Sequence, residues 1–129
     1  MDAKDIVASY FDALAKGEME RTLSFFALEA KWDQPGRNKF AGIKSNLGEI
    51  IKMFEGIMSD TLGHMTVAPT GKMMENAGLV AVPVWFSAQK EGKTMNLGGL
   101  DLFEIKEDKI IHVWTFSADQ PVDDEFWGE

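Results

Sequence analysis

The fold is decided by residues 95–119, which read MNLGGLDLFEIKEDKIIHVWTFSAD. Apolar residues recur on both sides of a short charged corner, Lys106-Glu107-Asp108-Lys109. This pattern predicts two long strands joined by a tight turn, because residues two apart on a strand share one face of a sheet. Asp101 interrupts the apolar run of the first strand. A carboxylate in such a place is costly unless it is paired or stays protonated, so Asp101 is the first candidate functional residue.

The alternation also sorts the side chains of this hairpin by face. On the first arm, the face of Asp101 is shared by Gly99, Phe103 and Ile105. On the second arm, one face carries Val113, Thr115, Ser117 and Asp119, and the other carries His112, Trp114 and Phe116. His112 and Asp119 therefore lie on opposite faces, and we do not expect them to form a pair across one pocket.

The composition limits the classes of protein to consider. The 129 residues are 45% hydrophobic and 26% charged, which predicts one globular domain over residues 1–129. The net charge of −8 argues against binding to nucleic acid or to an anionic membrane surface. The chain has no cysteine and two histidines far apart in the sequence, so we expect no disulfide, no metal site and no cofactor.

The sequence carries no recognisable secretion signal or membrane span. It begins Met1-Asp2-Ala3-Lys4-Asp5, which lacks the basic start and the apolar run of a signal peptide. No apolar run approaches the length of about 20 residues that spans a bilayer. Together with the absence of cysteine, these features predict a cytoplasmic protein.

Three helices are predicted in the first half of the chain. Residues 2–16 have apolar side chains at helical spacing, and Tyr10 lies on the buried stripe of that helix. Residues 18–26 predict a second, short helix. Residues 46–59 give the clearest helical pattern, and Asn46 with Glu49 forms a capping-box sequence at its start.

Strands are predicted between and after these helices. A short strand near residues 30–34 ends at Pro35-Gly36, and the polar, aromatic loop over residues 32–42 has the composition of a binding loop. Period-two patterns predict strands over residues 64–74 and 79–89. Pro83 cannot donate to a ladder, so the second of these strands is expected to bulge there or to lack a neighbour on that side.

The element order predicts an α+β fold with three N-terminal helices packed on one face of a strongly curved antiparallel sheet. Gly98-Gly99 is the natural place for the sheet to bend. A strongly curved sheet with helices on one face forms a cone. The open end of the cone leaves a hollow, which is the usual place for a ligand site. The opposite face of the sheet is rich in Trp and Phe, and it predicts a homodimer formed through this open face.

Several features in order resemble the superfamily of nuclear transport factor 2, ketosteroid isomerase and the SnoaL-like polyketide cyclases. They are Tyr10 in its helix, Trp32-Asp33-Gln34-Pro35-Gly36, Leu100-Asp101-Leu102-Phe103, Lys109-Ile110-Ile111, Asp119 and Phe126-Trp127. The resemblance covers nearly the whole chain and implies the cone-shaped, cystatin-like fold of that superfamily. It also implies a pocket for a small apolar or aromatic ligand, and the lining residues we expect are Trp32, Gln34, Phe54, Phe86 and Phe103.

Ketosteroid isomerases, by resemblance, use an aspartate base, a helix tyrosine and a protonated aspartic acid. Tyr10 resembles the tyrosine and Asp101 resembles the neutral acid, and both groups would donate to a developing oxyanion. The base differs, because Gln34 stands before Pro35 where those isomerases have aspartate, and an amide does not abstract protons. Asp33 would point to the opposite face unless the chain bulges beside Pro35.

Two functions therefore remain open at the level of the sequence. The first is an isomerase or cyclase that acts by acid–base chemistry on an apolar carbonyl compound. In that function Asp101 and Tyr10 hold the oxygen, and Asp33 or Asp119 moves the proton. The second is a non-catalytic module that uses the same cone for ligand binding or dimerisation. The incomplete base site favours the second function, and the buried polar groups favour the first.

Overall fold

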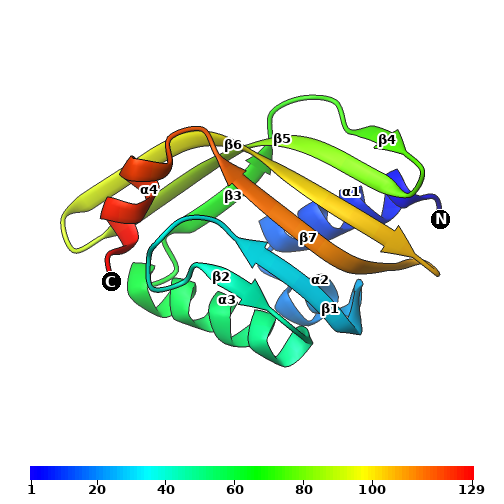
Figure 1. Cartoon of the computed structure of the whole chain (residues 1–129), viewed down its shortest axis with the longest axis horizontal. Helices are drawn as coiled ribbons and strands as arrows, with labels where there is room; N and C mark the ends of the chain where they lie inside the picture. The colour runs from blue at the N-terminus through cyan, green and yellow to red at the C-terminus, as the bar shows by residue number, and fades with distance from the viewer.

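The computed structural model describes residues 1–129 and is built around one seven-stranded sheet. Figure 1 shows α1 and α3 on one side of this curved sheet and α4 at one end of it. The elements in chain order are α1 (Ala3–Ala15), α2 (Met19–Ser24), β1 (Phe26–Gln34), β2 (Gly42–Lys44), α3 (Leu47–Thr61), β3 (Met65–Pro69), β4 (Met74–Asn76), β5 (Leu79–Lys90), β6 (Lys93–Lys106), β7 (Lys109–Ser117) and α4 (Gln120–Trp127).

The α+β class and the curved sheet are confirmed, but the sheet is mixed rather than antiparallel. The strand order is β2-β1-β7-β6-β5-β3, and β4 pairs with β5. β1 is longer than predicted and runs parallel to β7, so that Trp32 lies opposite Val113. The sequence pattern could not reveal this pairing, because parallel neighbours are joined through long crossovers rather than local turns.

The hairpin of residues 95–119 forms as predicted, with β6 and β7 joined at Glu107 and Asp108. Both corner residues have positive φ, 52° and 63°, as a two-residue turn between twisted strands requires. The register places Asp101 opposite Thr115, on the face of the sheet that the helices cover. We call this the inner face and the other side the outer face.

The helices begin at polar caps and bury apolar stripes against the inner face. Asp2 and Asp5 form a capping box at α1, and the Asn46 side chain accepts from the Glu49 backbone amide at the start of α3. One core cluster joins α1, α3 and the sheet, and its largest fully buried side chains include Tyr10, Phe103 and Ile50. No helix is both long and apolar enough to cross a membrane.

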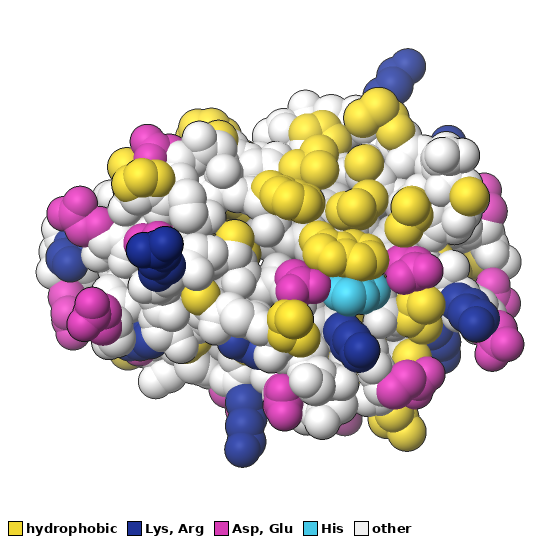
Figure 2. All heavy atoms as spheres, in the orientation of Figure 1, with side chains coloured by type: hydrophobic (Ala, Val, Ile, Leu, Met, Phe, Trp, Pro, Cys, Tyr) yellow, Lys and Arg dark blue, Asp and Glu magenta, His cyan; other side chains and the backbone are white.

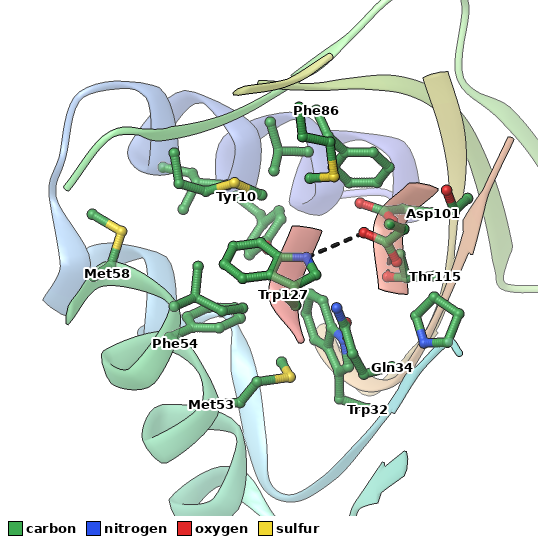
Figure 3. A pocket seen from close by; sticks show the side chains of 18 of the residues that line it. Tyr10, Trp32, Gln34, Met53, Phe54, Met58, Phe86, Asp101, Thr115 and Trp127 are labelled. Carbon is green, nitrogen blue, oxygen red and sulfur yellow. Dashed lines mark hydrogen bonds between the residues drawn. The ribbon is translucent and has the colours of Figure 1, made fainter. Parts of the chain in front are cut away.

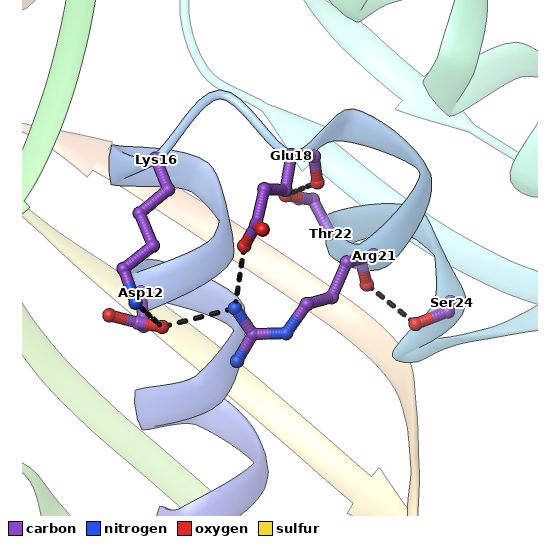
Figure 4. Close-up of polar contacts among 6 residues, drawn as sticks. All are labelled: Asp12, Lys16, Glu18, Arg21, Thr22 and Ser24. Atoms are coloured by element: carbon purple, nitrogen blue, oxygen red, sulfur yellow. Dashed lines mark hydrogen bonds and ion pairs between the residues drawn. The ribbon is translucent and has the colours of Figure 1, made fainter.

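A polar cluster fixes α2 against α1 (Figure 4). Arg21 donates to the carboxylates of Asp12, at 3.0 Å, and Glu18, at 2.8 Å, and Lys16 also reaches Asp12. All four side chains are exposed, so solvent screens each pair and its contribution to stability is small. The cluster therefore orients the short helix rather than supplying much stability.

The helix α4 was not predicted. Asp119 is its N-cap and accepts from the backbone amide of Val122 at 3.3 Å, and Pro121 lies in the first turn. The sequence pattern placed Asp119 at the end of a strand, and Asp119 was also a candidate proton carrier. An N-cap followed by proline was the available signal, but eight residues with three acidic side chains give a weak apolar stripe.

Candidate functional site

A cavity of about 210 Å³ lies between the inner face of the sheet and helices α1, α3 and α4. Thirteen of its 20 lining residues are hydrophobic, and none is lysine, arginine or histidine. A cavity of about 150 Å³ in another protein holds benzene, so this one suits a ligand of roughly two fused rings. The missing basic side chains make the cavity a poor site for an anionic ligand.

Aromatic and methionine side chains form most of the wall (Figure 3). The rings of Trp32 and Phe54 meet edge to face with centroids 5.3 Å apart, and Trp127 enters from α4. The methionines that line the cavity are Met19, Met53, Met58, Met65 and Met95. Because methionine is unbranched and polarizable, this wall adapts to flat apolar ligands of different outline.

Asp101 lines this cavity, and its carboxyl group is almost fully buried from solvent. Its exposed fraction is 3%, and its one hydrogen bond comes from Thr115 Oγ1 to Oδ1 at 3.0 Å. Burial raises the pKa of Asp101 to about 7, although the Thr115 bond opposes this shift. Near neutral pH the group is therefore a proton donor in a large share of molecules, and its second oxygen is free for a ligand.

Tyr10 supplies a second donor from α1. Its ring is packed edge to face against Phe11, Phe26 and Phe103, and its exposed fraction is 2%. Tyr10 lines the cavity, and its hydroxyl makes no hydrogen bond within the protein. Burial, and next the Asp101 carboxylate, raise the pKa of Tyr10 well above its usual value, so the hydroxyl keeps its proton.

Gln34 and Asp123 add polar groups at the end of β1 and on α4. Gln34 Oε1 accepts from Trp32 Nε1 at 2.8 Å, which fixes the indole against the cavity. Asp123 Oδ1 accepts from Trp127 Nε1 at 3.1 Å, the dashed bond in Figure 3. Asp123 lines the cavity, is 7% exposed, and was missed by sequence analysis because α4 itself was missed.

Comparison with known proteins identifies the family. The model of the SnoaL-like domain matches residues 7–113. This chain belongs to the SnoaL-like family. A crystal structure of a protein of unknown function with a cystatin-like fold, from Xanthomonas campestris, is 32% identical over 100% of both chains, with a TM-score of 0.95.

More distant relatives also match most of this chain. An uncharacterized protein of Mycobacterium tuberculosis is 23% identical over 95% of this chain and 94% of its own length. The structure of TerC, co-crystallized with polyporic acid, is 16% identical over 95% of each chain, with a TM-score of 0.83. The resemblance to the SnoaL-like and nuclear transport factor 2-like superfamily is thereby confirmed.

The cavity of this SnoaL-like protein brings together only part of the predicted site. Tyr10 and Asp101 line it, as do four of the expected ligand contacts, Trp32, Gln34, Phe54 and Phe86. Phe103 lies instead in the core beneath the cavity, where its ring packs against Tyr10 with centroids 5.5 Å apart. No three side chains of His, Cys, Asp or Glu come close enough together to hold a metal ion.

Asp33 and Asp119, the two proton carriers proposed from the sequence, lie outside the cavity. Asp33 points to the outer face, where its Oδ2 lies 2.7 Å from His112 Nε2. Strand alternation puts it there, since no bulge at Pro35 reverses Asp33 and Gln34. Asp119 is exposed at the N-cap of α4. The titratable side chains that do line the cavity are Tyr10, Asp101 and Asp123.

Proposed function

We propose that this protein is a small-molecule enzyme, an isomerase or cyclase that acts by acid–base chemistry on a neutral, apolar carbonyl compound. The observation that carries this proposal is a pair of oxygen groups on the wall of one apolar cavity, the Tyr10 hydroxyl, which has no partner in the protein, and the Asp101 carboxyl group, whose only partner is Thr115. A tyrosine hydroxyl and a protonated carboxyl group both donate to a carbonyl oxygen. Such bonds strengthen as negative charge develops there.

Three further features support a small organic ligand in this cavity. An unpartnered buried polar group costs free energy, and nothing in the packing of α1 or β6 repays that cost without a ligand. The cavity lacks the basic side chains that an anionic ligand would need. TerC, a protein of the same fold, has been co-crystallized with polyporic acid, which supports a small organic ligand here.

Binding of 2-naphthol tests the oxygen-holding pair, because its hydroxyl stands in for the enol oxygen of a bicyclic substrate. We expect the wild-type protein to bind it in isothermal titration calorimetry, and Tyr10→Phe to weaken binding about tenfold, the worth of one hydrogen bond of about 1.4 kcal/mol. Asp108→Asn, in the exposed β6–β7 turn, is the matched control and should bind normally. Equal affinities for wild type and Tyr10→Phe would exclude this role of the hydroxyl.

Measuring the exchange of C–H hydrogen for deuterium distinguishes an enzyme from a protein that only binds its ligand. We expect the wild-type protein to accelerate exchange at C1 of 2-tetralone in D₂O, followed by proton NMR, because holding the carbonyl oxygen acidifies the neighbouring C–H bond. A protein that binds 2-naphthol but leaves the exchange rate at the buffer value would be the non-catalytic alternative.

We also propose that the outer face of the sheet binds a second copy of this chain. Leu100 and Phe116 lie opposite each other there, as do Leu102 and Trp114, and hydrophobic side chains form a patch on this face in Figure 2. Phe116 is 50% exposed and Trp85 is 45% exposed in the single chain. Such a contiguous apolar patch is typical of an isologous dimer interface.

A charge placed in this patch should abolish the dimer. We expect sedimentation velocity to report a dimer for wild type and a monomer for Phe116→Glu, because two buried carboxylates would face each other without partners. Leu62→Glu is the control, since Leu62 is 85% exposed at the end of α3, away from the sheet. A wild-type protein that sediments as a monomer at high micromolar concentration would contradict the dimer.

A further inference from the structure

We propose that Asp123 is the catalytic base of the cavity, and that it removes a proton from the carbon next to the carbonyl group held by Tyr10 and Asp101. This inference rests on the proposed function and adds a residue to it. Asp123 comes from α4, the one helix that the sequence pattern did not predict. It would supply the proton acceptor that Gln34 cannot provide at the end of β1.

The choice among the cavity's titratable groups follows from their surroundings. Tyr10 is buried among aromatic rings close to Asp101 and keeps its proton. Asp101 has a single neutral donor, Thr115, and the rest of its environment favours the protonated acid. Asp123 is the remaining group on the wall, and two carboxyl groups in different environments divide the acid and base roles.

The hydrogen bonds to Asp123 favour its ionised form. Gln120 Nε2 donates to Oδ2 at 2.9 Å, and Trp127 Nε1 donates to Oδ1 at 3.1 Å. Both donors have only N–H hydrogens to offer, so they stabilise a carboxylate. Burial and the neighbouring Asp124 act in the opposite direction and raise the pKa of Asp123 overall, which makes it a stronger base than an exposed aspartate.

The adjacent residue, Asp124, fixes the helix that carries this base. Its Oδ1 accepts from the Arg37 backbone amide and from Asn38 Nδ2, both at 2.9 Å. Gly36 lies so close to Gln120 and Asp124 that a methyl group there would collide with both side chains. α4 is thus clamped to the loop that follows Gln34, while Asp123 turns toward the cavity.

The proposed step is a balanced proton transfer. The C–H bond next to the carbonyl breaks, its electron pair forms a C=C bond, and the carbonyl π electrons move to the oxygen, where Tyr10 and Asp101 donate hydrogen bonds. The proton moves to the Asp123 carboxylate. Its return to a different carbon of a conjugated enol gives an isomer. When the proton on Asp123 first exchanges with D₂O, return of a deuteron to the original carbon gives the exchange product. No electrons are gained or lost, and no co-reactant is needed.

The test compares exchange and binding in the same variants. We expect Asp123→Asn to slow deuterium exchange of 2-tetralone at least 100-fold, because the amide cannot accept the proton. The same variant should bind 2-naphthol within about threefold of wild type, because the oxygen-holding pair is intact. Glu125→Gln, an exposed neighbour on α4, is the charge-matched control and should exchange at the wild-type rate.

A second variant reports on the base without removing it. Trp127→Phe keeps an aromatic ring and deletes the N–H donor, so the pKa of Asp123 should rise and the acid limb of the pH–rate profile should move to higher pH. Wild-type exchange rates in Asp123→Asn would overturn the role of Asp123 and leave the proposed function standing. Loss of 2-naphthol binding in that variant would also overturn it, by placing Asp123 in ligand binding. A wild-type protein without exchange activity would overturn the proposed function itself.

Discussion

Asp101→Asn should raise the free energy of unfolding above that of wild type. This gain should be about 3 kcal/mol larger at pH 8 than at pH 5. The native carboxyl group has its pKa raised to about 7, while the unfolded chain has the ordinary aspartate value. Between these two values the native state holds a proton that the unfolded state has lost. The contribution of Asp101 to the stability of the wild type is therefore fully present below its pKa in the unfolded chain. This contribution is lost as the pH rises through 7.

Asparagine has no proton to lose, so Asp101→Asn avoids this decline and still accepts from Thr115 through its amide oxygen. Urea unfolding from pH 5 to pH 8 measures the difference, which corresponds to a rise in Tm of roughly 10 °C for a domain of this size. The exposed control Asp108→Asn should show no such pH dependence. A constant difference between Asp101→Asn and wild type across this range would mean that Asp101 titrates normally.

The same substitution should weaken the proposed activity, because the amide Nδ2–H of asparagine is a weaker hydrogen-bond donor than a protonated carboxyl group. A residue retained only for stability would not be an acid whose replacement stabilises the fold. Loss of 2-naphthol affinity together with a gain in stability is the expected pair of results. Unchanged affinity in a stabilised variant would leave Asp101 as a buried acid without a part in ligand binding.

Gly99→Ala should destabilise the protein by about 3 kcal/mol, whereas Gly98→Ala should be nearly neutral. A methyl group on Gly99 would collide with the backbone oxygen of Phe116 on β7 and with the ring of Phe86. The backbone oxygen belongs to the β6–β7 ladder and cannot move without separating the strands beside Asp101. At Gly98 the nearest atoms are 3.9 Å away, in the Trp85 ring, so a methyl group fits there.

Neither glycine has a positive φ, so neither substitution strains the backbone conformation. The difference in stability between the two variants therefore measures the steric collision at Gly99. Urea unfolding gives the two free-energy changes, and calorimetry with 2-naphthol shows whether the cavity is disturbed at the same time. We expect Gly99→Ala to lose affinity as well, since Phe86 lines the cavity. Equal stabilities for the two variants would show that β6 and β7 adjust without cost at this position.

Local sequence patterns determined the elements with strong periodicity or distinctive turns. The β6–β7 hairpin, the capped helix α3 and the buried position of Tyr10 follow from side-chain spacing and turn chemistry that act within a few residues. Asp101 could be recognised for the same reason, because a carboxyl group in an apolar strand conflicts with its neighbours. The expected curved sheet follows from strand length and the glycine pair.

Only the tertiary structure decided which polar groups share the cavity. The pairing of β1 with β7 put Asp33 on the outer face beside His112, and it left Gln34 on the cavity wall. The C-terminal helix, held by Asp124 against the loop after Gln34, brought Asp123 to the wall. These contacts join residues more than 75 positions apart, and no local periodicity records them, because the free energy that fixes them arises only when the packed elements meet.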